Sequence, residues 1–327
     1  MAGWLHGAAA LIAALSTLAS TLHAQDWPTR PLTMVVPFQA GGPVDVLGRI
    51  LAQNLGDVTG KPVIIDNIPG GGGMVGSLRV AQGPPDGHMF VLGSIGTHAL
   101  NQTLSKKPLY NAATDFAPVA LVADVGLVLL VRKELPAHNL QEFIAYARAN
   151  QGKMQFGSGG TGTSSHVGCV LLNQTIGIDT VHVPYRGGGP ALADLIAGRI
   201  DYLCNIASTV GQALETKQVS ALAALTRERS PILPDLPTAH EQGLPDFDAY
   251  TWNAVFLPKG TPRALVDKLN AAIIKVMDMP SFSERLATLG LIVPKPERRT
   301  PDYLGKFVAN EIDKWAAPIK ASGARED

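Results

Sequence analysis

The sequence predicts an α/β protein of two lobes, in which each lobe is a mainly parallel sheet flanked by helices. Short apolar runs alternate along the chain with glycine-rich loops and with segments of helical periodicity, as is typical of parallel sheets. The 327 residues exceed the length at which a single hydrophobic core usually stops growing. The segment 116–140 is typical of extended strand, and it separates the first three loops from the last three.

An apolar run at residues 8–22 comes before the first predicted strand. It is too short to span a bilayer, and Ala24 follows it as a small residue suited to cleavage. We therefore interpret residues 1–24 as a secretory signal peptide, cleaved near Ala24, that exports the chain to an oxidising compartment. An uncleaved anchor is the alternative, because residues 1–7 contain no Lys or Arg.

The first predicted strand, 32–36, is a short apolar run rich in β-branched residues. Gly41 and Gly42 then allow a sharp turn, and Pro43 suits the first position of a helix. Helical spacing follows in Val44, Leu47, Leu51 and Leu55. Because a glycine N-cap has no side-chain oxygen, the first amides of this helix and its dipole are available to an anion.

Five more units repeat this arrangement. Strands are predicted at 62–65, 89–92, 154–156, 181–183 and 200–203. Each of them leads into a loop rich in glycine or hydrogen-bonding side chains. Ligands of parallel sheets bind beyond the carboxyl ends of the strands, so we expect all six loops to lie at one edge.

Two extended segments are expected to connect the lobes. The first contains predicted strands at 119–123 and 128–131, and the second, 243–260, returns the chain to the first lobe. Helical patterns follow at 262–277, 281–289 and 301–319, and we expect these helices to pack on the first lobe. The predicted first lobe comprises residues 25–125 and 248–327, and the second lobe residues 126–247. A small-molecule site is expected between them.

The composition excludes several kinds of partner. Basic and acidic residues number 27 each, whereas a nucleic-acid-binding protein requires a basic face. The sequence contains no Cys-x-x-Cys or His-Glu-x-x-His motif, so no metal site is expected. Cys169 and Cys204 are the only cysteines, and both a disulfide and two separately buried thiols are compatible with the pattern.

An enzyme is the alternative to a binding protein. The loop from Gly157 to Gly162 matches the pattern G-x-G-x-x-G, which would indicate an NAD(P)-binding enzyme. That pattern requires an acid at the end of the following strand, but Asp179 precedes this strand. His98 and His166 could act as bases, although neither paired carboxylates nor an evident nucleophile accompany them. The loops are therefore suited to holding a ligand rather than to converting it.

Several motifs along the chain carry a resemblance to a known family. They are Pro37-Phe38-x-Ala40-Gly41-Gly42-x-x-Asp45-x-x-x-Arg49, Asn67-x-Pro69-Gly70-x-Gly72-Gly73, Gly157-Ser158-x-Gly160-x-Gly162-x-x-x-His166, Val183-Pro184-Tyr185-Arg186-Gly187-x-x-Pro190-Ala191 and the tail Gly243-Leu244-Pro245 … Trp252 … Pro258-x-Gly260-Thr261-Pro262. Together they resemble the Bug (Bordetella uptake gene) family of periplasmic solute-binding receptors of tripartite tricarboxylate transporters. Two positions depart from its pattern: Ile68 stands where arginine is usual, and Gln39 where proline or alanine is common.

The resemblance implies a Venus-flytrap fold of the periplasmic-binding-protein type, no enzymatic activity and no cofactor. It implies a di- or tricarboxylate or an aromatic acid as ligand, and the membrane subunits of a tripartite transporter as partners. The protein itself would be a periplasmic monomer. Asp45 and Arg49, one helical turn apart, are interpreted as a structural ion pair.

The resemblance also places the ligand. The inner carboxylate would bind the loop 38–42, the second lobe would add hydroxyl and amide donors, and Arg186 could pair with an outer carboxylate. Asn101 is a further possible polar group of the pocket. The expected ligand-binding residues are Phe38, Gln39, Ala40, Gly41, Gly42, Ser94, Thr97, His98, Ser158, Thr161, Thr163, Tyr185, Arg186, Gly187 and Asn205.

Overall fold

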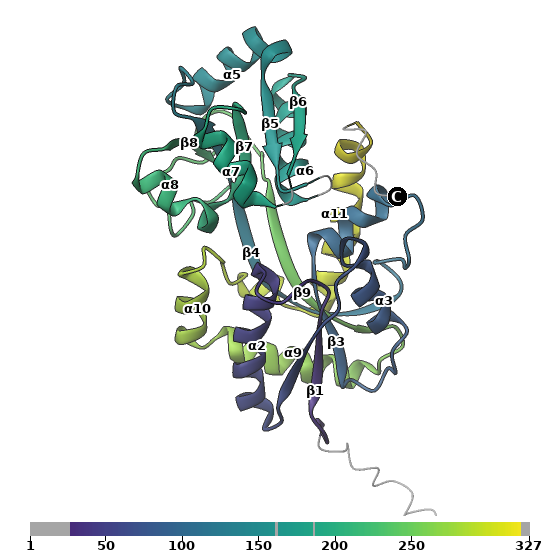
Figure 1. Cartoon of the computed structure of the whole chain (residues 1–327). Helices are drawn as coiled ribbons and strands as arrows, with labels where there is room; N and C mark the ends of the chain where they lie inside the picture. Colours follow the sequence, from purple (N-terminus) through teal and green to yellow (C-terminus); the bar gives the residue numbers. More distant parts are fainter. Residues whose placement is uncertain (1–26, 161–162, 186, 322–327) are drawn as a thin grey trace, which may run out of the picture.

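In the computed structural model, which describes residues 27–160, 163–185 and 187–321, nine strands form one sheet flanked by helices (Figure 1). The strands follow the order β2-β1-β3-β9-β4-β7-β5-β6, and β8 pairs with β4. Their bounds are β1 (Leu32–Val36), β2 (Val63–Asn67), β3 (Met89–Ser94), β4 (Phe116–Arg132), β5 (Gln155–Ser158), β6 (Val181–Pro184), β7 (Tyr202–Ile206), β8 (Val219–Ala224) and β9 (Tyr250–Pro258). The predicted α/β class is confirmed.

The sheet has two halves, which we call the first and the second lobe. In the first, β1 pairs parallel with β2 and β3, and β3 pairs antiparallel with β9. In the second, β5 pairs parallel with β6 and β7, whereas β7 and β8 run antiparallel to β4. The α-helices are α2 (Pro43–Thr59), α3 (Met74–Ala81), α4 (Asn101–Leu104), α5 (Leu140–Asn150), α6 (Ser164–Ile176), α7 (Gly188–Ile196), α8 (Gly211–Glu215), α9 (Arg263–Met277), α10 (Pro280–Ala287) and α11 (Pro301–Ala321).

Each central strand fills two cores. In β1, Met34 and Val36 belong to the core that contains α2 and α9, whereas Val35 belongs to the core that contains α3 and α11. In β4, Leu129 packs with α5 and α6, and Leu130 packs on the opposite face with α7 and α8. Successive side chains of a strand point to opposite faces, which is why these strands are apolar at nearly every position.

The long strand β4 joins the lobes. Its residues 116–126 pair with β9, and residues 127–132 pair with β7 and β8. The second connection runs beside it, since Leu127 N donates to Ala249 O (3.2 Å). The separate strands that we predicted at 119–123 and 128–131 are wrong: they form one strand of 17 residues, because Gly126 between them stays paired with Tyr250. The change of partner lies next to the predicted lobe boundary, whose limits stay a prediction.

The last helix, α11, packs on more of the molecule than we expected. It contacts β4 and α4 of the first lobe, as predicted, and also α6 of the second lobe (Figure 1). Trp315 of α11 and Val167 of α6 share one core with Trp252 of β9. Helix α11 therefore spans the junction of the two lobes.

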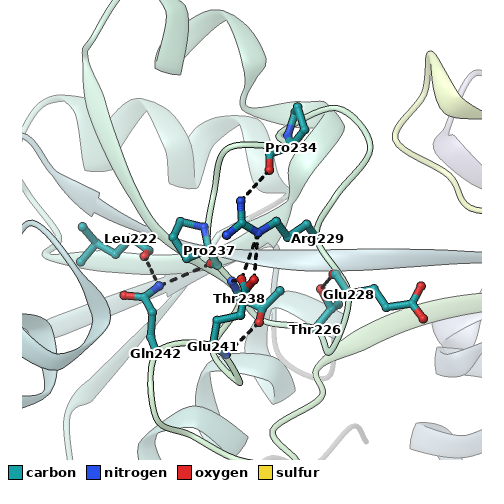
Figure 2. Close-up of polar contacts among 9 residues, drawn as sticks. All are labelled: Leu222, Thr226, Glu228, Arg229, Pro234, Pro237, Thr238, Glu241 and Gln242. Atoms are coloured by element: carbon teal, nitrogen blue, oxygen red, sulfur yellow. Dashed lines mark hydrogen bonds and ion pairs between the residues drawn. The ribbon is translucent and has the colours of Figure 1, made fainter.

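The segment 226–243 follows β8 and lies beside its end, and Figure 2 shows polar contacts made by this segment. Ala224 N at the end of β8 donates to Pro237 O (2.9 Å), which extends the pairing beyond the strand. Arg229 donates to both carboxylate oxygens of Glu241 (3.1 and 3.0 Å). Thr238 and Glu241 exchange two further hydrogen bonds (2.7 and 3.0 Å), as in a capping box. These contacts keep the strand edge from pairing with another chain.

A disulfide joins Cys169 of α6 to Cys204 of β7, with a Cα–Cα distance of 5.4 Å. Of the two possibilities that the sequence left open, a disulfide and two separately buried thiols, the structure shows the disulfide. Within the described ranges, none of the helices is both long and apolar enough to cross a bilayer. The interpreted signal peptide, 1–24, lies outside the described residues.

Candidate ligand-binding cleft

A cavity of about 650 Å³ lies between the two lobes. The first lobe contributes the turn after β1 and the residues after β3, and the second lobe contributes the start of α6 and the end of β7. The connecting strands β4 and β9 add Val125, Thr251 and Asn253. The loops at the carboxyl ends of β1, β3 and β7 therefore open into one cavity, as the parallel pattern predicts.

The turn after β1 is shaped by Asp45. Its Oδ2 accepts from Gly41 N (2.8 Å) and from Arg49 Nε (2.8 Å), which confirms the expected Asp45–Arg49 ion pair. Its Oδ1 accepts from Asn67 Nδ2 (2.9 Å), which also donates to Phe38 O (3.1 Å). The hydrogen bond from Arg49 is the main reason that the pKa of Asp45 falls to about 2. Asp45 thus ties the loop 38–41 to both α2 and β2.

This network changes which amides can meet an anion. The N–H of Gly41 is bound by Asp45, and that of Gly42 donates to Gln39 O (3.4 Å). Gly42 is the N-cap of α2 and provides no side-chain cap, and Pro43 has no N–H. The first intrahelical bond runs from Val46 N to Gly42 O (2.9 Å). The amides of Val44 and Asp45, in the uncapped first turn, are therefore the donors that α2 offers.

The loop after β3 divides into a cavity-lining part and a buried part. Ser94 and Asn101 line the cavity. Thr97 and His98 are fully buried behind them, where Thr97 Oγ1 accepts from Ser94 N (2.9 Å) and lies 2.8 Å from His98 Nδ1. The His98 ring stacks on Phe256 at 3.9 Å, and burial lowers its pKa to about 3. Both side chains shape the turn and do not line the cavity.

In the second lobe, Thr163 and Ser164 line the cavity at the start of α6. Thr163 Oγ1 caps this helix by accepting from His166 N (3.4 Å), and it donates to Gly160 O (2.8 Å). Ser158 is only 1% exposed, and its Oγ lies 2.7 Å from His182 Nε2. Its Oγ also bonds within the loop, to Gly160 O and from Gly160 N (3.1 Å each), and Ser158 is not among the residues that line the cavity.

His182 and His166 form a stacked pair next to this loop, with ring centroids 4.0 Å apart. Burial lowers the pKa of each to about 4, so both rings are neutral at pH 7. Although Ser158 and His182 resemble a nucleophile and its base, the burial of the hydroxyl argues for a structural hydrogen bond.

The other described residues of the predicted set are not among those that line the cavity. Tyr185 is half-buried against the core that contains α7, and its hydroxyl donates to Asp194 Oδ2 (2.8 Å). Gly187 caps α7, and Asn205, 6% exposed, faces the start of that helix at Gly188. The Nδ2 of Asn205 is buried without a hydrogen-bond partner among the described residues. Gln39 and Ala40 are exposed, and Thr161 and Arg186 lie outside the described residues.

The structure therefore brings together Phe38, Gly41, Gly42, Ser94 and Thr163 of the predicted set, together with Asn101. Sequence reasoning missed many of the lining residues, and two groups of them come from outside the strand-end loops. Thr251 and Asn253 face the cavity from β9, and Thr288, Leu289 and Leu291 reach it from the segment after α10. The first group could have been suggested by the extended connection that we predicted there. No local signal marks the second group, because it follows a helix rather than a strand.

The electrostatics of the cavity are simple. None of the described residues that line the cavity has a charged side chain. The backbone amides at the start of α2 add a partial positive charge. Hydroxyl, amide and backbone groups supply the polarity. Such a lining can hold one carboxylate at a helix N-terminus, and its described residues do not include a nucleophile with an adjacent base.

Comparison with known proteins identifies a family and structural neighbours with bound carboxylates. Residues 47–324 match the family described as tripartite tricarboxylate transporter family receptor. BugT of Bordetella pertussis is 33% identical over 313 residues, which is 95% of this chain and 95% of that protein. The structure of MatC from Rhodopseudomonas palustris with bound malate shares 38% identity with a TM-score of 0.75, over 90% of this chain and 100% of that one. A second R. palustris structure, with adipate, shares 33% identity with a TM-score of 0.78, over 91% and 99%.

Proposed function

The chain belongs to the tripartite tricarboxylate transporter receptor family, and on this basis we propose that it captures a small organic carboxylate between its lobes in the periplasm. It then delivers this ligand to the membrane subunits of a tripartite transporter. The family consists of solute-binding receptors rather than enzymes. Malate and adipate in two structural neighbours support a carboxylate as the ligand class.

One observation carries the proposal for this chain. The uncapped first turn of α2 opens into a cavity between two lobes that also presents Ser94 and Asn101. Hydrogen bonds to a charged group contribute about 1.5–3 kcal/mol each. Two amides and one or two side-chain donors therefore suffice to hold one carboxylate without a cationic side chain.

The NAD(P)-enzyme alternative has less support. Strand β6, which follows the loop starting at Gly157, ends at Pro184, and the next side chain, Tyr185, is bound to Asp194. The ribose-binding acid that the dinucleotide pattern requires is thus missing from the described part of this strand end.

A thermal-shift measurement on the mature protein tests the proposal. A carboxylate at a hundredfold above its Kd should stabilise the protein by about 2.7 kcal/mol. This corresponds to a rise in Tm of about 5–10 °C for a chain of this size. NAD(P) should give no shift, and the bound acid should be recovered unchanged. The absence of a shift with every acid of a broad panel, or turnover of a bound acid, would contradict the proposal.

A further inference from the structure

One side of the cleft is built from aliphatic side chains. Two of them project from the first turns of α2, two follow α10, and the other two come from β4 and from the end of β7. We call this set the aliphatic wall: Val44, Val46, Val125, Ile206, Leu289 and Leu291. All except the buried Val125 are half-buried, so they present apolar surface to the open cavity.

Contacts between elements bring several members of the wall together. Helix α10 contacts α2, and both lie on the same side of the connecting strands (Figure 1). Beyond α10, Ile292 exchanges two backbone hydrogen bonds with Asp124 (2.9 and 2.8 Å). This pairing brings Leu291 next to Val125 of β4. The anchor for a carboxylate, at the amides of Val44 and Asp45, therefore borders directly on apolar surface.

The hydroxyl groups of the lining are already partly used. Thr163 Oγ1 donates to Gly160 O (2.8 Å), Thr209 Oγ1 to Ile206 O (2.8 Å) and Thr288 Oγ1 to Arg285 O (2.7 Å). Each hydroxyl has a single proton, so none of the three can also donate to a carboxylate. They present acceptor oxygens, which repel a second carboxylate, and methyl groups, which cannot bind one.

The lining also lacks a charged partner for a second carboxylate, as far as the described residues show. Ser164 and Thr251 add further hydroxyls to the lining, but the aliphatic wall itself has neither a donor nor a cation. Burying a carboxylate against the wall is therefore unfavourable, whereas an apolar group gains by leaving water there. The same site would thus accept one carboxylate at α2 and an apolar group against the wall.

From this geometry we infer, on the basis of the proposed function, that the preferred ligand is a monocarboxylic acid with an apolar body, aliphatic or aromatic. Its carboxylate binds the first turn of α2, and its body covers the aliphatic wall. Leu289 and Leu291, which come from outside the strand-end loops, determine this specificity. Dicarboxylates of the same length bind less tightly, because their outer charge meets the wall.

Matched pairs of acids test the inference by isothermal titration calorimetry on the mature protein. Hexanoate and adipate have the same number of carbon atoms, and benzoate and terephthalate share the same ring. In each pair, the second acid has one more carboxylate than the first. We expect the monocarboxylate of at least one pair to bind at least tenfold more tightly than its diacid. Tighter binding of the diacid in both pairs would overturn the inference alone. If none of the four acids binds, the inference fails, whereas the proposed function fails only if the broad panel of acids also gives no thermal shift.

Two substitutions identify the wall as the cause. Leu291→Ser should weaken hexanoate binding about fourfold to fifteenfold, in line with the value of roughly one to two buried methylene groups. Leu289→Arg should invert the preference towards adipate by supplying a cation. Leu109→Arg, at an exposed leucine outside the cavity, is the matched control and should leave both affinities unchanged. Unchanged affinities in both wall variants, with the fold intact by circular dichroism, would overturn the role of the wall.

Discussion

At the scale of single residues, Asp45 has the largest number of consequences, because its carboxylate binds Gly41, Arg49 and Asn67 at once. Asp45→Ala should destabilise the protein by about 1–3 kcal/mol, since these donors lose a buried acceptor. It should also weaken ligand binding at least tenfold, because the loop before α2 loses its shape. Urea unfolding and calorimetry measure the two effects.

The matched control for Asp45 is Asp267→Ala. Asp267 accepts from Arg263 Nε (2.8 Å) with the same four-residue spacing, but both side chains are exposed, so little change is expected. The pKa of Asp45 is lowered in the fold to about 2, so its contribution is present above pH 4 and is lost as the pH falls towards 2. An equal effect of both substitutions would contradict the special role of Asp45.

The amide of Val44 can be tested directly. Val44→Pro removes this N–H from the second position of α2, where a proline is tolerated, and should weaken carboxylate binding by about 1–3 kcal/mol. Val44→Ala removes side-chain atoms but keeps the N–H, which separates the amide from the wall. Ala264→Pro, at the second position of α9, is the control for the backbone change. If Val44→Pro and Val44→Ala weaken binding equally, the amide is not a ligand donor.

At the scale of elements, the position of α3 depends on Gly76. A Cβ at this residue would lie 2.5 Å from Ile68 O and 2.9 Å from Pro37 Cα, both of which are backbone atoms. Gly76→Ala should therefore destabilise the protein by about 1–3 kcal/mol by pushing α3 away from β1 and β2. Gly152→Ala is the control, since nothing lies within 4 Å of its Cβ position. Thermal unfolding measures both, and equal Tm values would contradict this packing.

At the scale of the whole molecule, three histidines make stability depend on pH: His98 and His166 are buried, and His182 is half-buried. The folded pKa values of His98, His166 and His182 are lowered, mainly by burial, to about 3, 4 and 4. The unfolded chain therefore binds more protons below pH 6.5, and stability is lost as the pH falls from 6.5 towards 4. The loss between pH 7 and pH 5 should be about 1–2 kcal/mol for each histidine.

Asp124 opposes this loss of stability, because burial raises its pKa to about 6 despite the Arg298 ion pair. As the pH falls, the folded protein therefore binds a proton at Asp124 before the unfolded chain does. His182→Phe keeps the aromatic stack with Phe156 and should make the pH dependence of urea unfolding shallower. His138→Phe, at an exposed position, is the control. A slope that is unchanged in His182→Phe would contradict the assignment.

Closure of the lobes is the second prediction at this scale. The lobes are joined at residues 126–127 of β4 and by the neighbouring connection at Ala249, so few residues need to change for a hinge motion. X-ray scattering should show a smaller radius of gyration with a saturating carboxylate. An unchanged radius would indicate a rigid protein. The cause would then be helix α11, which contacts both lobes.

Local patterns determined much of this protein. The alternation of apolar runs with glycine-rich loops predicted the α/β class and the edge at which the loops gather. The motif from Pro37 to Arg49, together with Asn67, marked the turn at which the structure places the Asp45 network. These features depend on residues close in sequence, or on strand ends that parallel pairing brings to one edge.

Only the tertiary structure decided which side chains face the cleft. Thr97, His98 and Ser158 sit at strand ends as predicted, but burial behind the turns makes them supports of the loops. The amides of Gly41 and Gly42 already donate to Asp45 and Gln39. The free amide donors are therefore those of the next residues, at the start of α2. Leu289 and Leu291 reach the cleft because α10 packs on α2, nearly 250 residues away in sequence. Contacts between segments so distant leave no local pattern, because they depend on how the completed lobes pack.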